Sequence, residues 1–347
     1  MNTILKRALT AAPFAVALLC LSACKGSTSG GVVAGPTPPP SNGSVYLTDS
    51  APLVGGGSLD QVLVFPQNTN GGTAPAQDIT GNTTGLSIPL GIAVDHSGNM
   101  WVTNSGTSSI TEYPAGATGD IAPINTVQGS ATFLSSPVGI AVDANSDLFV
   151  VNSQLDSSGF FEVLEFGPNP TGNQAPIRRI GGAATLLNSP QYVVVDPSGN
   201  VYVTNSVLGA SLINIFGPGA AGNTAPIVSF NGGCALPDGI ALDASNNIYA
   251  ACDGDYTIRE YSALNGSNIP TQIRSLGVNS SLPQLFNPSG IALNPLGTLF
   301  VANTGVVNIG PGDVTIYAPS FINSTAPGAS IGGGNSNVFR PAGIALH

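Results

Sequence analysis

One segment of sixteen residues recurs along this chain, and it constrains the fold more than any other feature. Each copy begins with Pro and continues as Gly-Ile-Ala-Val-Asp or a close variant. The starting prolines lie 48, 53, 47, 51 and 53 residues apart. Self-similarity at such a period is typical of architectures in which each repeat is one supersecondary unit. The six copies are PLGIAVDHSGNMWVTN (89–104), PVGIAVDANSDLFVVN (137–152), PQYVVVDPSGNVYVTN (190–205), PDGIALDASNNIYAAC (237–252), PSGIALNPLGTLFVAN (288–303) and the shorter PAGIALH (341–347).

Each complete unit is expected to form four short β-strands. Apolar residues alternate with a period of two, and turns rich in Gly and Asn separate the apolar stretches. The chain holds 45 Gly and 28 Pro, a density that helices do not tolerate. In the first complete unit the expected strands cover 92–94, 101–103, 110–113 and 122–127, with turns at 97–99 and 116–119. Four-stranded units repeated around an axis are the blades of a β-propeller.

The two ends of the repeat region complete one another. The last copy contains only a first strand, within 343–346. The segment before the first copy supplies a second strand at 45–48, a third at 62–65 and a fourth at 76–79. An open ring would expose two apolar sheet faces to water, so these fragments are expected to pair. We therefore predict an all-β fold: one six-bladed β-propeller over residues 44–347, closed by its N-terminal strands and its C-terminal strand.

The repeat resembles the NHL repeat, whose pattern runs roughly P-x-G-I-A-V-D-x-x-G-N-I-Y-V-A-D. The resemblance covers all six units and implies a propeller. Asn104, Asn152, Asn205 and Asn303 replace the Asp that usually ends the second strand, and Cys252 replaces it once. Propellers of this kind include interaction platforms, lyases and hydrolases, so the resemblance fixes no activity.

One rim of the ring is the expected recognition surface. An antiparallel first and second strand bring the P-x-G residues and the strand-ending Asn residues to the same rim, together with the loops of variable length. The longest of these loops are expected at 51–59, 153–160 and 304–312. Variation confined to one rim is typical of a scaffold that carries recognition loops. The candidate binding residues at the channel mouth are Asp238, Gln191, Asp49, Asn104, Asn152, Asn205 and Asn303; Asp49 and the Asn residues are alternatively expected to satisfy backbone donors at strand ends.

A metal-dependent hydrolase is the alternative. Pro237-Asp238-Gly239 resembles a motif of the gluconolactonase/regucalcin family, in which Glu, Asn and Asp side chains hold a divalent cation at the channel mouth. Only Asp238 carries over, because apolar or hydroxyl residues stand where the other ligands are expected. A single carboxylate is a poor ligand set for a hard cation. We therefore expect no cofactor, and a divalent cation only if this alternative holds.

The N-terminus predicts export. A positive pair, Lys6 and Arg7, precedes an apolar stretch, and Leu21-Ser22-Ala23-Cys24 resembles the lipobox of bacterial lipoproteins. Residues 1–23 are therefore expected to be a signal peptide, Cys24 to be lipidated, and 24–43 to be a flexible Gly/Ser/Pro tether. Lys25 after the Cys favours the outer membrane or the cell surface. An ordinary secretory signal is the alternative.

Two cysteines remain in the propeller region. Cys234 precedes a first strand by three residues, and Cys252 ends the neighbouring second strand on the same rim. In an oxidising exported compartment this placement predicts a disulfide. Two free buried thiols are the alternative.

The charge composition of the chain limits the classes of ligand that it can bind. The full chain has 18 acidic and 8 basic residues, and five of its six Arg are scattered along the repeats. The chain therefore lacks the clustered basic residues that bind a nucleic-acid phosphate backbone, and this excludes nucleic-acid binding. We expect a monomeric, envelope-anchored binding module for a protein, a peptide or a neutral glycan. A hydrolase or lyase, and a structural envelope protein that binds nothing specific, stay open as alternatives.

Overall fold

A computed structural model describes residues 43–52, 58–277, 285–305, 311–322 and 325–347. The chain divides into two units, 1–39 and 40–347, and all described residues belong to the second. The expected signal peptide, the lipobox and nearly all of the tether lie outside the described residues. Within the described part, no helix has the length and apolar character needed to cross a membrane.

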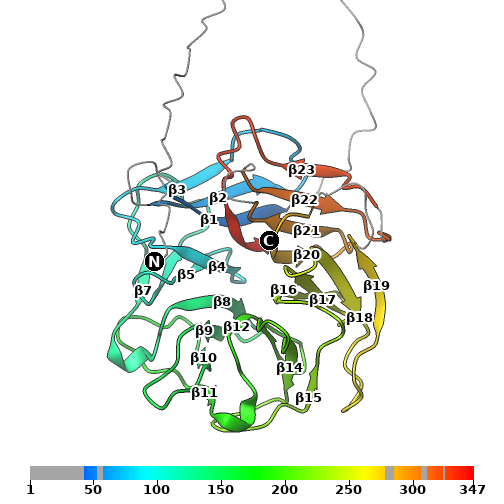
Figure 1. Ribbon diagram of the computed structural model, residues 1–347. Helices are drawn as coiled ribbons and strands as arrows, with labels where there is room; N and C mark the ends of the chain where they lie inside the picture. Colours follow the sequence, from blue (N-terminus) through cyan, green and yellow to red (C-terminus); the bar gives the residue numbers. More distant parts are fainter. Residues whose placement is uncertain (1–42, 53–57, 278–284, 306–310, 323–324) are drawn as a thin grey trace, which may run out of the picture. The chain divides into compact units, whose positions relative to one another are not determined.

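The second unit is a six-bladed β-propeller of four-stranded antiparallel blades, as predicted (Figure 1). Two 3-10 helices, η1 (Ser130–Thr132) and η2 (Ala183–Thr185), join blades. Blade 1 contains β24 (Pro341–Leu346), β1 (Ser44–Pro52), β2 (Ser58–Pro66) and β3 (Gln77–Thr80); blade 2 contains β4 (Pro89–Val94), β5 (Met100–Asn104), β6 (Ser109–Tyr113) and β7 (Asn125–Val127); blade 3 contains β8 (Pro137–Val142), β9 (Leu148–Asn152), β10 (Glu162–Phe166) and β11 (Arg178–Gly181). Blade 4 contains β12 (Pro190–Val195), β13 (Val201–Asn205), β14 (Leu212–Phe216) and β15 (Val228–Phe230); blade 5 contains β16 (Pro237–Leu242), β17 (Ile248–Cys252), β18 (Thr257–Tyr261) and β19 (Gln272–Leu276); blade 6 contains β20 (Pro288–Leu293), β21 (Leu299–Asn303), β22 (Asp313–Tyr317) and β23 (Ala329–Ile331).

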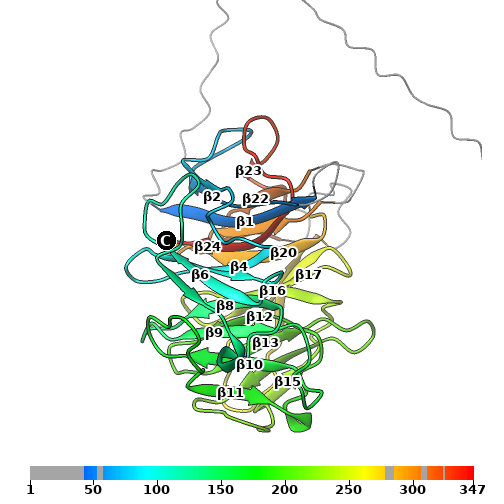
Figure 2. The same cartoon turned by 90° about the vertical axis from the view of Figure 1, so that its left-hand side faces the viewer.

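The ring closes through blade 1, which is built from both ends of the repeat region. Strand β24 pairs with β1, with Leu346 opposite Val45 and Ile344 opposite Leu47. The backbone of Ser44 also exchanges hydrogen bonds with that of His347, at 2.7 and 3.2 Å. Figure 2 shows the two strands side by side. The predicted composite blade is confirmed.

The first strands of neighbouring blades pack against one another around the axis. Their contacts run from β24 to β4, β8, β12, β16 and β20 and return to β24. The buried side chains form six clusters, and each cluster lies between two neighbouring blades. Removing one face of one blade would therefore expose a whole cluster to water.

The two ends of the expected loop at 51–59 are strand: residues 51–52 belong to β1 and residues 58–59 to β2. Strands β1 and β2 continue past the end of the other hairpins and pair as far as Pro52 opposite Ser58. Residues 53–57 lie outside the described part. This extension makes the hairpin of blade 1 the longest of the ring, so it rises above the rim where the first strands begin.

Glycine in the P-x-G segment permits the close approach of the first strands. A Cβ added to Gly91 would lie 2.2 Å from the carbonyl oxygen of Val138 in the next blade, and one added to Gly239 would lie 2.1 Å from that of Ser289. Blade 4 departs from this rule, since Tyr192 occupies the position of the glycine.

Candidate functional site

The P-x-G segments and the ends of the second strands lie on the same rim, as predicted. In blade 2, Pro89 at the start of β4 pairs with Asn104 at the end of β5, and the same pairing recurs in blades 3 to 6. The residue that precedes the proline has a left-handed backbone in five blades, a conformation that disfavours branched side chains such as that of Ile88. Those five residues are Ile88, Ser136, Ser189, Leu236 and Asn287.

The strand-ending Asn residues are buried and hold the protein's own backbone. Their side-chain oxygens each accept a hydrogen bond from the backbone N–H two residues before the proline of the same blade. The donors are Ser87 to Asn104 at 3.1 Å, Ser135 to Asn152 at 2.9 Å, Asn188 to Asn205 at 2.9 Å and Phe286 to Asn303 at 3.3 Å. All four are at most 2% exposed. These contacts are those of the strand-end role expected of the four residues, and the binding role stays a prediction.

Asp49 occupies the same position in blade 1. Its carboxylate accepts the backbone N–H groups of Phe339 at 2.7 Å and Arg340 at 3.1 Å. Burial raises the pKa of Asp49 to about 6, although the two N–H groups and the Arg340 charge act in the opposite direction. Asp49 therefore fixes the backbone on which Arg340 is carried.

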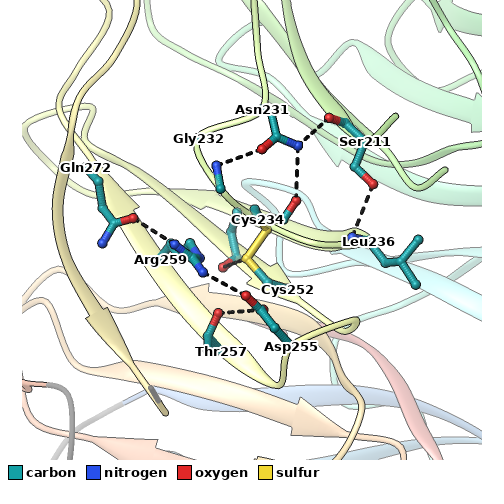
Figure 3. A network of polar contacts seen from close by, with 12 residues as sticks. Ser211, Asn231, Gly232, Cys234, Leu236, Cys252, Asp255, Thr257, Arg259 and Gln272 are labelled. Carbon is teal, nitrogen blue, oxygen red and sulfur yellow. Dashed lines mark hydrogen bonds and ion pairs between the residues drawn. A yellow bond between two sulfur atoms is a disulfide. The ribbon is translucent and has the colours of Figure 1, made fainter. Parts of the chain in front are cut away.

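In blade 5 a disulfide takes this position. Cys252 ends β17 and is bonded to Cys234, which precedes β16, with a Cα–Cα distance of 5.2 Å (Figure 3). The predicted disulfide is confirmed. Asn231 holds the same segment by donating hydrogen bonds to the Ser211 carbonyl at 2.8 Å and the Cys234 carbonyl at 3.5 Å. The covalent bond thus replaces the Asn-to-backbone hydrogen bond of the other blades.

Two carboxylates lie close together on the blade 5 side of the rim. Burial and, to a smaller extent, the neighbouring Asp253 carboxylate raise the pKa of Asp238 to about 7. Burial also raises the pKa of Asp253, whose Oδ1 atom is buried with no hydrogen-bond partner among the described residues. No three His, Cys, Asp or Glu side chains of the described part gather as a metal site would require. Asp238 is thus accompanied by one acid rather than by a full ligand set.

Tyr192 extends across the axis of the ring. Its hydroxyl donates a 2.9 Å hydrogen bond to the carbonyl oxygen of Ala342, which belongs to blade 1, opposite blade 4. Burial and the nearby Asp238 raise the pKa of Tyr192 well above its ordinary value, so the phenol stays protonated and remains a donor. Tyr192 is not among the site residues predicted from the sequence; the Tyr in place of Gly in Pro190-Gln191-Tyr192 is the signal that could have found it.

The side-chain amide of Gln191 forms hydrogen bonds with Ser189, two residues earlier in the sequence. Its Nε2 atom donates to the Ser189 carbonyl at 3.1 Å and to the Ser189 hydroxyl at 3.3 Å. The predicted residues Gln191 and Asp238 therefore lie on the side of the rim formed by blades 4 and 5. Tyr192 extends from this side toward the opposite side, formed by blade 1.

A cavity of about 530 Å³ opens on that opposite side of the rim. Its volume is within the range of small-molecule sites. It lies where the long β1–β2 hairpin stands beside the first strands of blades 1 and 2 and the end of the second strand of blade 6. The lining residues are Ser50, Ser58, Ile88, Leu90, Thr304, Arg340 and Ala342. We refer to these seven residues as the rim pocket.

The rim pocket is apolar with a single charge. Ile88 is 47% exposed and projects from a left-handed backbone, and Leu90 and Ala342 are half-buried. Arg340 is exposed and brings the only charged side chain of the lining. Of the residues predicted from the sequence, only Asp49 contributes to this pocket, through the backbone of Arg340. In each of the six repeats, one residue directly precedes the starting proline, and Arg340 is the only charged one among these six. A comparison of these positions would have found it.

Comparison with known proteins shows that this chain is similar to several solved structures in fold. No protein-family model matches this chain, and no curated protein matches it. A protein of unknown function from Bacteroides caccae aligns with a TM-score of 0.62 at 11% identity, over 88% of this chain and 99% of that one. A protein provisionally assigned as a gluconolactonase aligns with a TM-score of 0.52 at 14% identity, over 75% of this chain and 81% of the other. A Bacteroides fragilis protein with a provisional 6-phosphogluconolactonase assignment gives 0.51 at 12% identity, over 89% and 100%.

These likenesses and the strand pairing agree on the architecture. The chain is a six-bladed propeller similar in fold to gluconolactonase-like propellers, and fold alone does not transmit an activity.

Proposed function

We propose that this protein is a binding module that takes its ligand in the rim pocket and is held at the cell envelope by a lipid on Cys24. The observation that carries the proposal is the rim pocket itself: a cavity of about 530 Å³ with apolar walls beside the P-x-G segments. Binding sites are typically concave and mostly apolar, with a few polar groups that orient the ligand.

The polar groups around the rim support binding over catalysis. The strand-ending Asn amides are taken up by backbone contacts. The hydroxyl of Ser50 donates to Asp60 at 2.6 Å, and that of Thr304 donates to the Asn287 carbonyl at 3.2 Å. The pocket therefore offers shape, an apolar surface and one cation, which suit recognition of a ligand better than bond cleavage.

The test is a fragment screen by ligand-observed NMR on the mature chain, repeated on two variants. Leu90→Trp fills the rim pocket, whereas Leu208→Trp changes a side chain that is 87% exposed on blade 4, on the loop between β13 and β14. We expect fragments that bind the native protein to lose binding in Leu90→Trp and to keep it in Leu208→Trp. Fragments that bind all three proteins equally would contradict the proposal.

Anchoring is tested separately. We expect the native protein to enter the detergent phase on Triton X-114 partitioning and to carry the mass of an acylated Cys24. A Cys24→Ser variant should remain in the aqueous phase, because two or more acyl chains are what hold a protein firmly on a membrane. A native chain without added mass would remove the anchor from the proposal.

A metal-dependent lactone hydrolase is the second candidate. Asp238 favours this candidate for two reasons. It forms a carboxyl pair with the neighbouring Asp253 on the same rim, and its pKa is about 7. The expected result for this candidate is a divalent-ion-dependent hydrolysis of gluconolactone that Asp238→Asn abolishes. Hydrolysis that is the same in Asp238→Asn, or that is absent, would exclude it.

A further inference from the structure

The arginines of the propeller are paired with acids, with one exception. Four of the five form ion pairs: Arg178 with Glu165, Arg179 with Glu162, Arg259 with Asp255 at 2.7 Å, and Arg274 with Glu260. Arg259 and Arg274 share blade 5, so the arginines are less scattered than the sequence suggested. Within the part of the chain that the structure describes, Arg340 alone has neither an ion pair nor a side-chain hydrogen bond. The sequence has no lysine after Lys25, so few other cations are available for a ligand.

Two carboxylates that contact residues of the rim pocket accept their hydrogen bonds from groups other than the Arg340 side chain. Asp49 uses its two oxygens on the backbone N–H groups of Phe339 and Arg340. Asp60 accepts the Ser50 hydroxyl at 2.6 Å and the Ile88 backbone N–H at 3.1 Å. Asp49 thus holds the backbone of Arg340, while the exposed Arg340 side chain, part of the rim pocket lining, has no ion-pair or hydrogen-bond partner among the described residues.

We propose that the rim pocket recognises a carboxylate attached to an apolar group, with Arg340 pairing with the carboxylate. A guanidinium presents two parallel N–H donors that match the two oxygens of a carboxylate. Ile88, Leu90 and Ala342 supply the apolar surface for the rest of the ligand. A singly charged group suits the site better than a dianion, because Arg340 is the only charged residue of the lining and the Asp49 carboxylate interacts with its charge. This inference rests on the proposed function and specifies its ligand.

The carboxylate could belong to a small free acid or to the C-terminus of a peptide. The test measures both with matched neutral partners: 4-phenylbutanoate against 4-phenylbutanamide, and acetyl-Gly-Leu-Phe with a free carboxylate against its C-terminal amide. Calorimetry on the mature chain is expected to show at least about tenfold tighter binding of one acid than of its amide. The acid that binds more tightly identifies the source.

Two substitutions isolate the charge. Arg340→Gln is expected to remove the preference for the acid and to leave amide binding unchanged, and Arg340→Lys should keep part of it. Raising the salt concentration should weaken acid binding in the native protein and not in Arg340→Gln. Because Asp49 holds residue 340 through the backbone N–H, Arg340→Gln should keep the fold and lose only the attraction between the Arg340 and Asp49 charges, so its melting temperature should be close to that of the native protein.

The failure of this inference can be told apart from the failure of the proposed function. Equal binding of acid and amide, lost in Leu90→Trp, would overturn the role of Arg340 and leave the rim pocket as a binding site. Acid binding that is unchanged in Arg340→Gln would also overturn it, as would the absence of binding by all four probes at millimolar concentration.

Discussion

At the end of each second strand, one side chain ties that strand to the segment before the proline of the same blade. Four blades use an Asn oxygen, blade 1 uses the carboxylate of Asp49, and blade 5 uses the Cys234–Cys252 disulfide. A buried backbone N–H without a partner costs free energy, so the position always holds an acceptor or a covalent substitute. The position therefore has the same structural role in every blade.

The equivalence of the disulfide and the Asn contact can be tested directly. Replacing both cysteines by Ala is expected to cost about 2–4 kcal/mol of unfolding free energy, since the bridge closes a loop with a sequence separation of 18. Cys234→Ala combined with Cys252→Asn should recover about 1 kcal/mol, because the Asn oxygen can accept the Ala235 backbone N–H. Urea unfolding under oxidising conditions measures both values. Equal stability of the two double variants would contradict the equivalence.

The pair Asp238 and Asp253 predicts a pH dependence of stability. The pKa of Asp238 is about 7 in the folded protein, against 3.8 ordinarily, so the folded state binds the proton more tightly than the unfolded state. Stability from this group is therefore present below pH 4 and is lost as the pH rises toward 7. Asp238→Asn should be more stable than the native protein at pH 8, by at least about 1 kcal/mol, and equally stable at pH 4.

Asp253→Asn is the companion variant. Removing its charge should lower the pKa of Asp238, which a carboxyl-carbon NMR titration records. An Asp238 pKa that is the same in Asp253→Asn as in the native protein would refute the coupling between the two acids.

At the scale of the elements, blade 1 joins the two ends of the repeat region. Strand β24 lies against β1, and Ile344 is buried in the cluster between blades 1 and 6. The same blade carries the long β1–β2 hairpin that forms one wall of the rim pocket. Ring closure and the candidate site therefore depend on the same strands.

Deletion of residues 341–347 is expected to abolish cooperative unfolding, because it removes the first strand of blade 1 and opens two interfaces. Ile344→Ala gives a graded version, with an expected cost of about 2–4 kcal/mol. Thermal unfolding followed by near-ultraviolet circular dichroism is the measurement, and Ile322→Ala is the control, since Ile322 is 67% exposed. A deletion variant that melts like the native protein would be incompatible with a closed ring.

At the scale of the whole molecule, contacts between blades hold the ring together. Hydroxyl groups on the second strands donate to the P-x-G carbonyls of the next blade: Thr48 to Leu90 at 2.7 Å, Thr103 to Val138 and Thr204 to Asp238, both at 2.6 Å. Tyr192 adds a longer connection, from blade 4 to Ala342 in blade 1. Its ring lies between the acidic side of the rim and the rim pocket.

The Tyr192 contact predicts a small loss of stability on removal of one oxygen. Tyr192→Phe should cost about 1 kcal/mol, because the Ala342 carbonyl loses a buried donor and keeps only the Ser289 hydroxyl at 3.0 Å. Tyr256→Phe is the matched control, as Tyr256 is 49% exposed. Urea unfolding at pH 7 compares the two. If both variants lose the same amount, the hydrogen bond across the axis contributes nothing.

The blade number, the four-stranded blade, the closing of the ring by its two ends and the disulfide could all be predicted from the sequence. These follow from a repeated pattern and from residues near one another in a blade, such as Cys234 and Cys252. The position of the rim pocket, in contrast, could be found only from the three-dimensional arrangement of the strands. The rim pocket depends on how far the β1–β2 hairpin continues and on which strands stand beside it, and the availability of Arg340 depends on what Asp49 and Asp60 contact. Such contacts join residues as much as 291 positions apart, which no local pattern encodes.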